Sequence, residues 1–443
     1  MTQTIIRDLG EGLILRRSTR EDARALADFQ GDIQSGSDTG EPDSNVAAWV
    51  EDLMERPHPT FDPADFTLVE NTRTGEIVSS LCLISQTWTY GGIPFGVGRP
   101  ELVATHRDYR GRGLVRAQMA VVHEWSAQRG EQMQAITGIP YFYRQFGYEM
   151  AMTLGGSRIG YRSHVPRLKE GKAEPYRVRQ ATEADLSFVT EVNAYGSQRY
   201  PVTCVWDEAM WRYELVGKSD NNICRRALRI IERVGGEPVG FLLHSTMLHS
   251  GGVSVVAYEL KPDVSWLAVT PPLVRYLWSE GERLAAPDPE KVVRFAFNLG
   301  AEHPVYQVFE KGLPHTVPAY AWYLRVPDLV GFLQHIAPEL ERRLAGSALV
   351  GHTGAIEISF YRTGLRLAFE EGRLATVTPW QPPEPEAGDA SFPDLTFLQL
   401  LFGYRSLGEL DHAFADCWTS KDEARALLEA LFPKRPSDVW PAS

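Results

Sequence analysis

The sequence predicts an α/β protein of mixed α+β architecture, in which one unit occurs twice and a third unit of another kind follows. Three observations carry this prediction. A strand pattern ends in a glycine-spaced basic turn at Gly111 and Gly113, and this turn opens a helix. A pattern near the N-terminus recurs 163 residues later. From Val326 onward, an amphipathic helix precedes strands in which apolar residues alternate.

The glycine-spaced turn is the most specific motif of the chain. It follows an apolar run that begins at Leu102, and the helix after it begins near Leu114. A helix start offers free backbone N–H groups and the positive end of the helix dipole, and glycines let a phosphate approach the backbone. Positive charge nearby comes from Arg107, Arg110, Arg112 and Arg116. The turn indicates a coenzyme A or nucleotide site, although an ordinary turn uses the same letters.

Two other phosphate-binding motifs are excluded by the letters themselves. The chain has no Gly-x-x-x-x-Gly-Lys-Ser/Thr motif, and Gly113 is not followed by the small residue that a dinucleotide fingerprint requires. The remaining pattern, from Val103 to Arg116, resembles the Gcn5-related N-acetyltransferases (GNATs). Asp108 departs from it, because the family often has Gln or Arg at that position.

The resemblance implies two binding segments for coenzyme A. Val103, Ala104 and Thr105 are expected to pair with the pantetheine arm as an added strand. The pyrophosphate is expected on the turn and the helix start, which comprise Gly111, Arg112, Gly113, Leu114, Val115 and Arg116.

The elements after the turn follow from local patterns. The helix has an apolar face formed by Leu114, Ala117, Val121 and Trp125. A strand is predicted over 134–139, and then a short helix that contains Tyr143 and ends at Gly147. A positioned phenol can protonate a leaving thiolate, which makes Tyr143 a candidate general acid. The alternative for Tyr143 is a packing role with a satisfied hydroxyl.

Composition and charge limit the function classes. A net charge of −12 argues against nucleic acid as the partner. The chain has no apolar run of transmembrane length and no signal peptide, so we expect no membrane partner and a cytoplasmic location. The histidines and cysteines show no metal-ligand spacing, and no metal is expected.

The internal repeat divides the first three quarters of the chain into two tandem copies, over 1–165 and 170–325. The matched positions are Arg16 with Arg179, Thr19 with Thr182, Asp22 with Asp185, Tyr143 with Tyr306, and Phe146 with Phe309. The same shift carries the two glycines of the turn onto Val274 and Tyr276. Pro271 or Pro272 can open a helix there but offers no N–H to a phosphate, so the second copy is predicted to lack a cofactor site.

Residues 326–443 form the third unit. An amphipathic helix over 328–344 precedes two strands with alternating apolar residues, namely Ile356, Ile358 and Phe360, then Leu365, Leu367 and Phe369. With the segment 397–406, this pattern resembles a sterol-carrier-like domain. Taken alone, such a domain would suggest lipid carriage.

The order of the three units resembles the enhanced intracellular survival (Eis) family of N-acetyltransferases. The resemblance implies transfer from acetyl-coenzyme A to amines, such as those of aminoglycosides and protein lysines, by a hexamer. It implies that Tyr143 is the general acid, that Gly138 and Ile139 lie on the strand beside the thioester, and that the terminal carboxylate of Ser443 is the general base. Many relatives end in an aromatic residue, and this chain does not.

The segment 28–55 is expected to contribute to the substrate pocket. Its acidic residues, with Phe29 and Trp49, suit polyamines and amino sugars. A second function class stays open beside the enzyme, namely a non-catalytic protein that binds a small molecule or lipid, or serves assembly, and retains the same fold.

Overall fold

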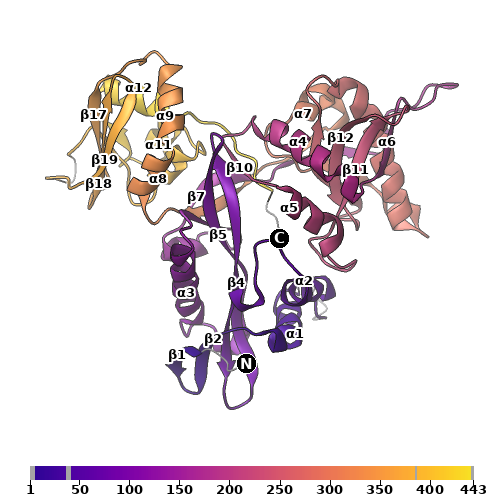
Figure 1. Ribbon diagram of the computed structural model, residues 1–443, viewed down its shortest axis with the longest axis horizontal. Helices are drawn as coiled ribbons and strands as arrows, with labels where there is room; N and C mark the ends of the chain where they lie inside the picture. Colours follow the sequence, from indigo (N-terminus) through magenta and orange to yellow (C-terminus); the bar gives the residue numbers. More distant parts are fainter. Residues whose placement is uncertain (1–4, 36–40, 385–386, 441–443) are drawn as a thin grey trace.

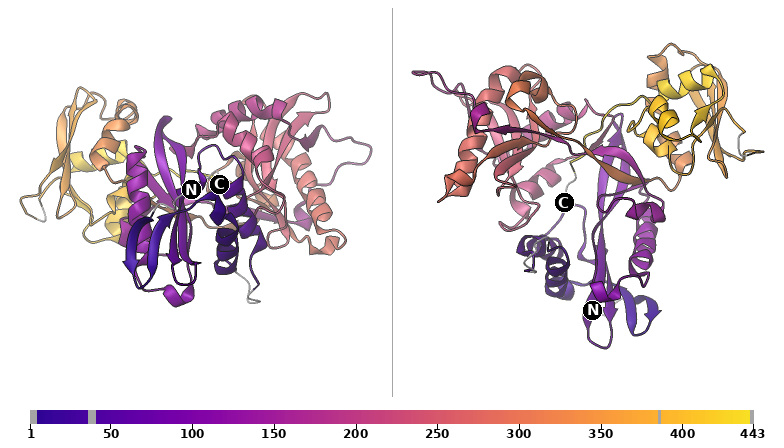
Figure 2. Two further views of the ribbon diagram at one scale, coloured as in Figure 1. Left: turned by 60° about the horizontal axis from the view of Figure 1, so that its bottom comes forward. Right: turned by 180° about the vertical axis from the view of Figure 1, so that it is seen from behind.

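Three β-sheets, each covered by helices, form three bodies around a common junction (Figure 1). The computed structural model describes residues 5–35, 41–384 and 387–440. Seen from behind, the first body lies below the other two, which sit on opposite sides of its upper end (Figure 2). The predicted mixed α/β fold is confirmed.

The first sheet has the strand order β1-β2-β3-β4-β5-β6-β16-β7, and β10 pairs with β4 outside this path. Leu81 and Leu83 on β4 pack with the helix α3 on one face, while Cys82 and Ile84 pack with α1 and α2 on the other. The strands are β1 (Ile5–Gly10), β2 (Leu13–Arg17), β3 (Phe66–Asn71), β4 (Glu76–Tyr90), β5 (Ile93–Thr105), β6 (Met133–Ile136) and β7 (Glu149–Leu154). The helices are α1 (Ala23–Ile33), α2 (Ser44–Glu55) and α3 (Leu114–Gln128).

The second sheet has the strand order β15-β8-β14-β13-β12-β11-β9. Its strands are β8 (Ser157–Tyr161), β9 (Tyr176–Gln180), β11 (Arg226–Arg233), β12 (Pro238–Ser245), β13 (Gly252–Leu260), β14 (Arg294–Phe297) and β15 (His315–Val317). Its helices are α4 (Leu186–Ser197), α5 (Glu208–Arg212), α6 (Trp266–Ala285) and α7 (Pro304–Val308).

The first two sheets exchange one strand each. β16 (Tyr320–Arg325) follows the second sheet in the chain, yet it pairs with β6 and β7 in the first. β8 follows the first sheet in the chain, yet it pairs with β14 and β15 in the second. A further link is β10 (Val202–Cys204), which pairs with the end of β4. The two sheets therefore depend on each other for their hydrogen bonding.

The prediction that a proline opens the helix of the second copy is wrong. α6 begins at Trp266, and Pro271 and Pro272 lie inside it. The carbonyl that loses its partner to Pro271 belongs to Leu267, whose side chain is 65% exposed, so this side of the helix faces solvent.

The third sheet has the strand order β19-β18-β17-β20-β21. The predicted helix over 328–344 is two helices, α8 and α9, because Pro338 in the first turn of α9 cannot continue the preceding helix. The two predicted strands occur as β17 and β18, with Phe360 just beyond the end of β17. The strands are β17 (Gly354–Ser359), β18 (Gly364–Glu370), β19 (Arg373–Trp380), β20 (Ala390–Ser391) and β21 (Trp418–Thr419). The helices are α8 (Leu329–His335), α9 (Ala337–Ala345), α10 (Phe397–Leu401), α11 (Leu407–Ala413) and α12 (Asp422–Leu431).

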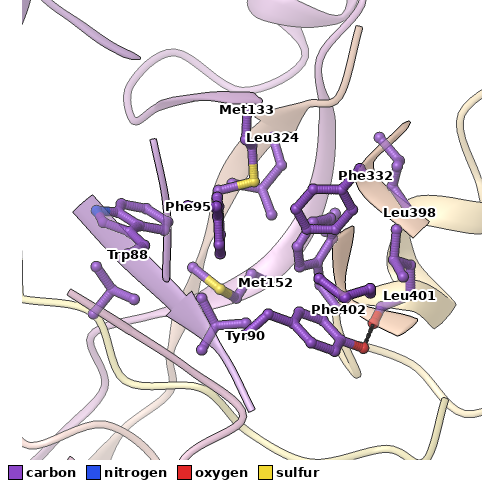
Figure 3. Packing of buried hydrophobic residues seen from close by; sticks show 14 of the residues in the cluster. Trp88, Tyr90, Phe95, Met133, Met152, Leu324, Phe332, Leu398, Leu401 and Phe402 are labelled. Atoms are coloured by element: carbon purple, nitrogen blue, oxygen red, sulfur yellow. Dashed lines mark hydrogen bonds between the residues drawn. The ribbon is translucent and has the colours of Figure 1, made fainter. Parts of the chain in front are cut away.

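One apolar cluster joins the first and third bodies at the junction (Figure 3). Tyr90 and Phe95 of the long strands meet Phe332 of α8 and Phe402 after α10 edge to face. The Tyr90 hydroxyl donates to the Leu401 carbonyl at 2.7 Å and accepts from Arg343 at 2.9 Å. Aromatic packing with satisfied polar groups fixes how the third body sits on the first.

Replacement of Tyr90 by Phe should lower the free energy of unfolding by about 1–3 kcal/mol, because the Leu401 carbonyl and an Arg343 N–H then stay buried without their partner. Urea unfolding followed by tryptophan fluorescence measures the change. Tyr195→Phe, at a 46% exposed position of α4, is the control and should stay within about 0.5 kcal/mol of the parent protein. Equal effects of the two variants would contradict the assigned contact.

Candidate active site

A cleft of about 640 Å³ opens in the first body between the end of β5, the glycine turn, the start of α3 and the short helix Phe142–Phe146. It gathers most residues that the sequence predicts for the site. These are Val103, Ala104, Thr105, Gly111, Gly113, Leu114, Val115, Arg116, Ile139 and Tyr143. The other residues of its lining are Tyr109, Arg110, Phe142, Gln145 and Phe146.

The glycine turn has a backbone that other residues rarely adopt. Gly111 and Gly113 both have φ near 76°, in the left-handed region. A Cβ at either position would meet nothing within 4 Å, so backbone conformation and not space requires glycine here. Gly113 caps α3, whose first turn leaves N–H groups without intrahelical partners at its positive end. The turn therefore presents donors and partial positive charge to the cleft.

The arginines near the turn divide into two groups. Arg116 donates to Gln145 at 2.8 Å and Arg110 donates to the Thr105 carbonyl at 3.4 Å, and both line the cleft. Arg112 does not line it, because its guanidinium pairs with Glu11 at 3.2 Å and lies 5.0 Å from the Tyr109 ring. Attraction to an acidic residue on the β1–β2 turn directs Arg112 away from the predicted position.

The end of β5 leaves one edge free. β5 pairs in parallel with β6 only at Val97 and Gly98, and the two strands diverge beyond that point. On its other side β5 stays paired with β4, as far as Thr105 opposite Ser79. Backbone groups at 103–105 therefore face the cleft from an unpaired strand edge, which is the geometry for adding an extended ligand.

A β-bulge in β5 is a feature that the sequence did not reveal. Leu102 has φ of 53°, which is rare for a branched residue, and the β4–β5 register shifts beside it. The buried Gln30 of α1 fixes this bulge, because its side-chain amide donates to the Leu102 carbonyl at 2.5 Å and to Ser80 at 2.8 Å. No local letter pattern signals a leucine in this conformation.

Tyr143 is buried at the inner end of the cleft, with 5% of its surface exposed. Burial raises its pKa above the usual value for tyrosine, and the nearby Glu101 and Tyr323 raise it further. The hydroxyl therefore stays protonated through the neutral range. A Cβ at Gly138 would lie 3.3 Å from the Tyr143 hydroxyl, so glycine at 138 lets the backbone lie against the phenol.

The strand predicted over 134–139 is wrong at its end. β6 ends at Ile136, Gly138 adopts φ of 134°, and Ile139 is 64% exposed. Gly138 and Ile139 therefore follow the strand and do not lie on it. Ile139 lines the cleft, whereas Gly138 does not and instead contacts Tyr143 beside it.

Two tyrosines of the exchanged strand β16 complete the site, and sequence reasoning missed them. The Tyr323 hydroxyl accepts from the Tyr141 N–H at 2.6 Å, and its ring centroid lies 5.7 Å from that of Tyr143. The Tyr320 hydroxyl donates to the Gly138 carbonyl at 3.2 Å. The segment 138–143 is thus held by a strand that the sequence assigns to the second copy.

The predicted substrate residues lie elsewhere. Phe29 on α1 and Trp49 on α2 are half-buried, and neither lines the cleft. Trp49 packs against the core between its helix and the sheet, and its indole N–H is buried without a partner in the described part of the chain. Ser443, the predicted base, lies outside the described residues.

Two further observations concern function classes. Over residues 5–35, 41–384 and 387–440, no group of His, Cys, Asp and Glu side chains is arranged to hold a metal ion. Within the same ranges, every helix is too short or too polar to cross a bilayer.

Comparisons with known proteins agree with this geometry. A family model described as an acetyltransferase (GNAT) domain matches residues 15–151. The matched residues contain β3 to β6, the glycine turn and Tyr143. The prediction of an N-acetyltransferase enzyme is confirmed by this family match. A comparison with curated protein sequences finds no match.

Solved structures similar to most or nearly all of the chain share its fold. A GCN5-related N-acetyltransferase from Kribbella flavida is 17% identical, with a TM-score of 0.66 over 97% of this chain and 100% of its own. Eis1 from Mycobacterium abscessus is 14% identical, with a TM-score of 0.60 over 97% and 99% of the two chains. An N-myristoyltransferase from Saccharomyces cerevisiae with bound myristoyl-CoA is 11% identical, with a TM-score of 0.52 over 72% and 80%. The similarity therefore extends beyond the GNAT domain to all three bodies.

Proposed function

We propose that the protein transfers an acetyl group from acetyl-coenzyme A to a primary amine of a small molecule or peptide, of the aminoglycoside, polyamine or lysine type. The observation that carries this proposal is the single cleft in which the free edge of β5, the glycine turn and Tyr143 meet. The GNAT domain supports acyl transfer as the chemistry.

The residues of the cleft suit each part of coenzyme A. The N–H groups of the turn and of the first turn of α3 can take the pyrophosphate, and Arg110 and Arg116 add charge at the same place. The unpaired edge at 103–105 can take the amide-containing pantetheine arm. The apolar surfaces of Leu114, Ile139 and Phe142 can cover the remainder. Acetyl-coenzyme A supplies an acetyl thioester at the inner end, beside Tyr143.

The protein's own groups then act on protons and orientation. The Tyr143 hydroxyl, kept protonated by burial, donates its proton to the leaving sulfur. A backbone N–H at the end of β5 polarises the acetyl carbonyl. The terminal carboxylate of Ser443 accepts the proton of the attacking ammonium, directly or through water. A terminal carboxyl has a usual pKa of about 3.5, so burial has to raise it for this role.

We further propose that the second body is a duplicated GNAT fold that does not bind coenzyme A. One network supports the duplication. Arg16 donates a bidentate pair of hydrogen bonds to Asp22 and one more to Glu70. Arg179 makes the same hydrogen bonds to Asp185 and Glu232. The exchanged strands also occupy matching places, since β16 lies next to β6 in the first sheet and β8 lies next to β14 in the second.

Two contacts support the loss of the cofactor site in the second body. Backbone groups satisfy the Tyr306 hydroxyl, which donates to the Phe297 carbonyl at 2.8 Å and accepts from the Leu299 N–H at 3.2 Å. The α6 start has no glycine turn before it. We therefore keep the tandem units 1–165 and 170–325 as a proposal. In each unit one strand of the sheet, β16 in the first and β8 in the second, comes from the other unit's part of the chain.

The third body, 326–443, is proposed to be sterol-carrier-like, with a curved sheet covered by helices on one side. The likeness of the whole chain to Eis1 supports the same order of units and, with it, a hexameric assembly in the cytoplasm as a working proposal. Gel filtration with light scattering measures the oligomer directly.

Catalysis is tested by release of the free thiol of coenzyme A in the presence of acetyl-coenzyme A and an aminoglycoside, a polyamine or a lysine peptide. We expect stimulation by at least one of these amines. If none stimulates release and calorimetry detects no binding of acetyl-coenzyme A, the proposed function is wrong.

Gly113→Ala should weaken acetyl-coenzyme A binding about 5- to 30-fold. Alanine at 113 leaves the left-handed backbone conformation in the free protein. Binding must restore that conformation, which costs alanine about 1–2 kcal/mol. Gly130 at the other end of α3 is the matched control, since it has φ of 70° and equally open space at its Cβ. Gly130→Ala should lose similar stability and keep its affinity in calorimetry; a loss of affinity in both would refute the phosphate role of the turn.

Tyr143→Phe should lower kcat by about 10²- to 10⁴-fold and leave acetyl-coenzyme A binding intact, because only the proton donor is removed. Since burial raises the pKa of Tyr143, the wild-type rate should show no decline from loss of this proton below about pH 10. Tyr306→Phe, the matched position of the second body, serves as control. It should lower stability and leave kcat unchanged.

Removal of Pro441 to Ser443 should abolish amine transfer while thermal unfolding and acetyl-coenzyme A binding stay at wild-type values. The physical reason is that the chain then ends at Trp440, and its new terminal carboxylate lies three residues short of the old one. Full turnover in this truncation would refute the carboxylate as general base.

A further inference from the structure

The second sheet contains a crevice at the place that matches the cleft of the first. β13 and β14 pair in parallel from Gly252 to Val255, and they diverge beyond Val255, whose carbonyl accepts from Asn298 at 2.7 Å. A small cavity follows, between α4, the end of β13 and the segment after β14. In the first sheet the same kind of divergence opens the cofactor cleft. In the second sheet the corresponding space is closed by another part of the chain.

The segment that closes it is the C-terminal tail, 435–440, which leaves the third body and crosses to the second (Figure 1). Asp438 and Trp440 line the cavity. The Ser437 carbonyl accepts from the Thr153 hydroxyl at 2.7 Å, and the Ser437 N–H donates to the same hydroxyl at 3.2 Å. Arg435 donates to the Arg199 carbonyl at 3.1 Å. The tail is thus bound along its length by backbone and side-chain contacts.

Asp438 enters a group of charged side chains. Arg199 pairs with Glu259, and His303 lies 3.8 Å from Glu259. A Cβ at Gly300 would lie 3.2 Å from the Asp438 carboxyl carbon, so glycine makes room for this side chain. Burial, and then Glu259, raise the pKa of Asp438 to about 7, while Arg199 lowers it. The Asp438 carboxyl thus lines the crevice near the ion pair of Arg199 with Glu259.

Trp440 fixes the direction of the chain at the seam between the first two sheets. The Trp206 indole donates to the Trp440 carbonyl at 3.3 Å, and the Arg226 guanidinium lies 5.6 Å from the Trp440 ring. Trp206 follows β10, and the adjacent Val205 N–H donates to the Thr87 carbonyl of β4 at 2.9 Å. Trp440 therefore lies beside the segment that joins the end of β4 through β10 and Val205.

From these contacts we infer that the crevice of the second body is a socket for the C-terminal tail, and that Asp438 and Trp440 are positioning residues for amine transfer in the first body. We call the residues that hold the tail the tail socket. They are Thr153, Arg199, Trp206, Arg226, Glu259 and Gly300. The inference rests on the proposed function, because it gives the second body the task of holding the chain that carries the terminal carboxylate. It also explains in physical terms why that body has no room for a cofactor.

The test compares two ways of releasing the tail. The double variant Asp438→Ala with Trp440→Ala removes the side chains that fill the socket. Thr153→Val removes the hydroxyl that bonds Ser437 without changing the tail itself. Trp440→Phe keeps an aromatic ring and serves as rescue. Lys434→Ala is the control, since Lys434 directly precedes the tail and pairs with Glu409 of the third body at 2.5 Å.

Amide hydrogen exchange of the peptide that contains 437–440 reports on the socket, and steady-state kinetics report on positioning. In the double variant we expect exchange of this peptide to rise at least about tenfold, and kcat for the amine to fall at least about tenfold. The KM for acetyl-coenzyme A should stay within about twofold, because the cleft of the first body is intact. Thr153→Val should change both readouts in the same direction and by less. Trp440→Phe and Lys434→Ala should match wild type.

Each contrary result has a separate meaning. Unchanged exchange in the double variant would refute the socket. Faster exchange with unchanged kcat would refute positioning. A parallel loss of acetyl-coenzyme A affinity would show general damage to the fold, and would also refute positioning. If wild type itself neither binds acetyl-coenzyme A nor acetylates an amine, the proposed function fails, and the exchange data still decide whether the socket holds the tail.

Discussion

The divergence of β5 from β6 after only two paired residues is the constraint on which the site depends. Parallel strands that stayed paired would bury their backbone groups and leave no cleft. Because the strands separate, the edge at 103–105 stays open, and α3 can direct its N-terminus at the gap. The bulge at Leu102, held by Gln30, shifts the register of β5 just before this edge. Phosphate donors, a free strand edge and a buried phenol thereby reach one small volume.

The exchange of β16 and β8 couples this site to the second body. Tyr320 and Tyr323 lie on β16 and bind the backbone at Gly138 and Tyr141, in the segment that leads to Tyr143. A change in the second body can therefore reach the phenol through the sheet hydrogen bonds of one strand. β16 thus supports the segment beside the cleft from within the first sheet, and the second body, by our inference, supports the tail.

Local signals in the sequence were sufficient for the cofactor side of the site. The turn at Gly111 and Gly113, the helix that starts at Leu114 and the short helix around Tyr143 all depend on neighbouring residues, and all were predicted at the right place. Contacts between distant segments were not predictable in this way. Strand exchange leaves no periodic trace in the letters, so the pairing of β16 with β6 and β7 is visible only in the structure. Arg112 turns to Glu11, about a hundred residues away in sequence, for the same kind of reason.

The central claim is that the chain has one working cofactor site, in the first body. Amide hydrogen exchange of the full-length wild-type protein with and without saturating acetyl-coenzyme A tests it most directly. The account predicts added protection at 103–105 and 111–116, and unchanged exchange at the end of β13 and the start of α6. Added protection at the start of α6, or none at the glycine turn, would contradict it.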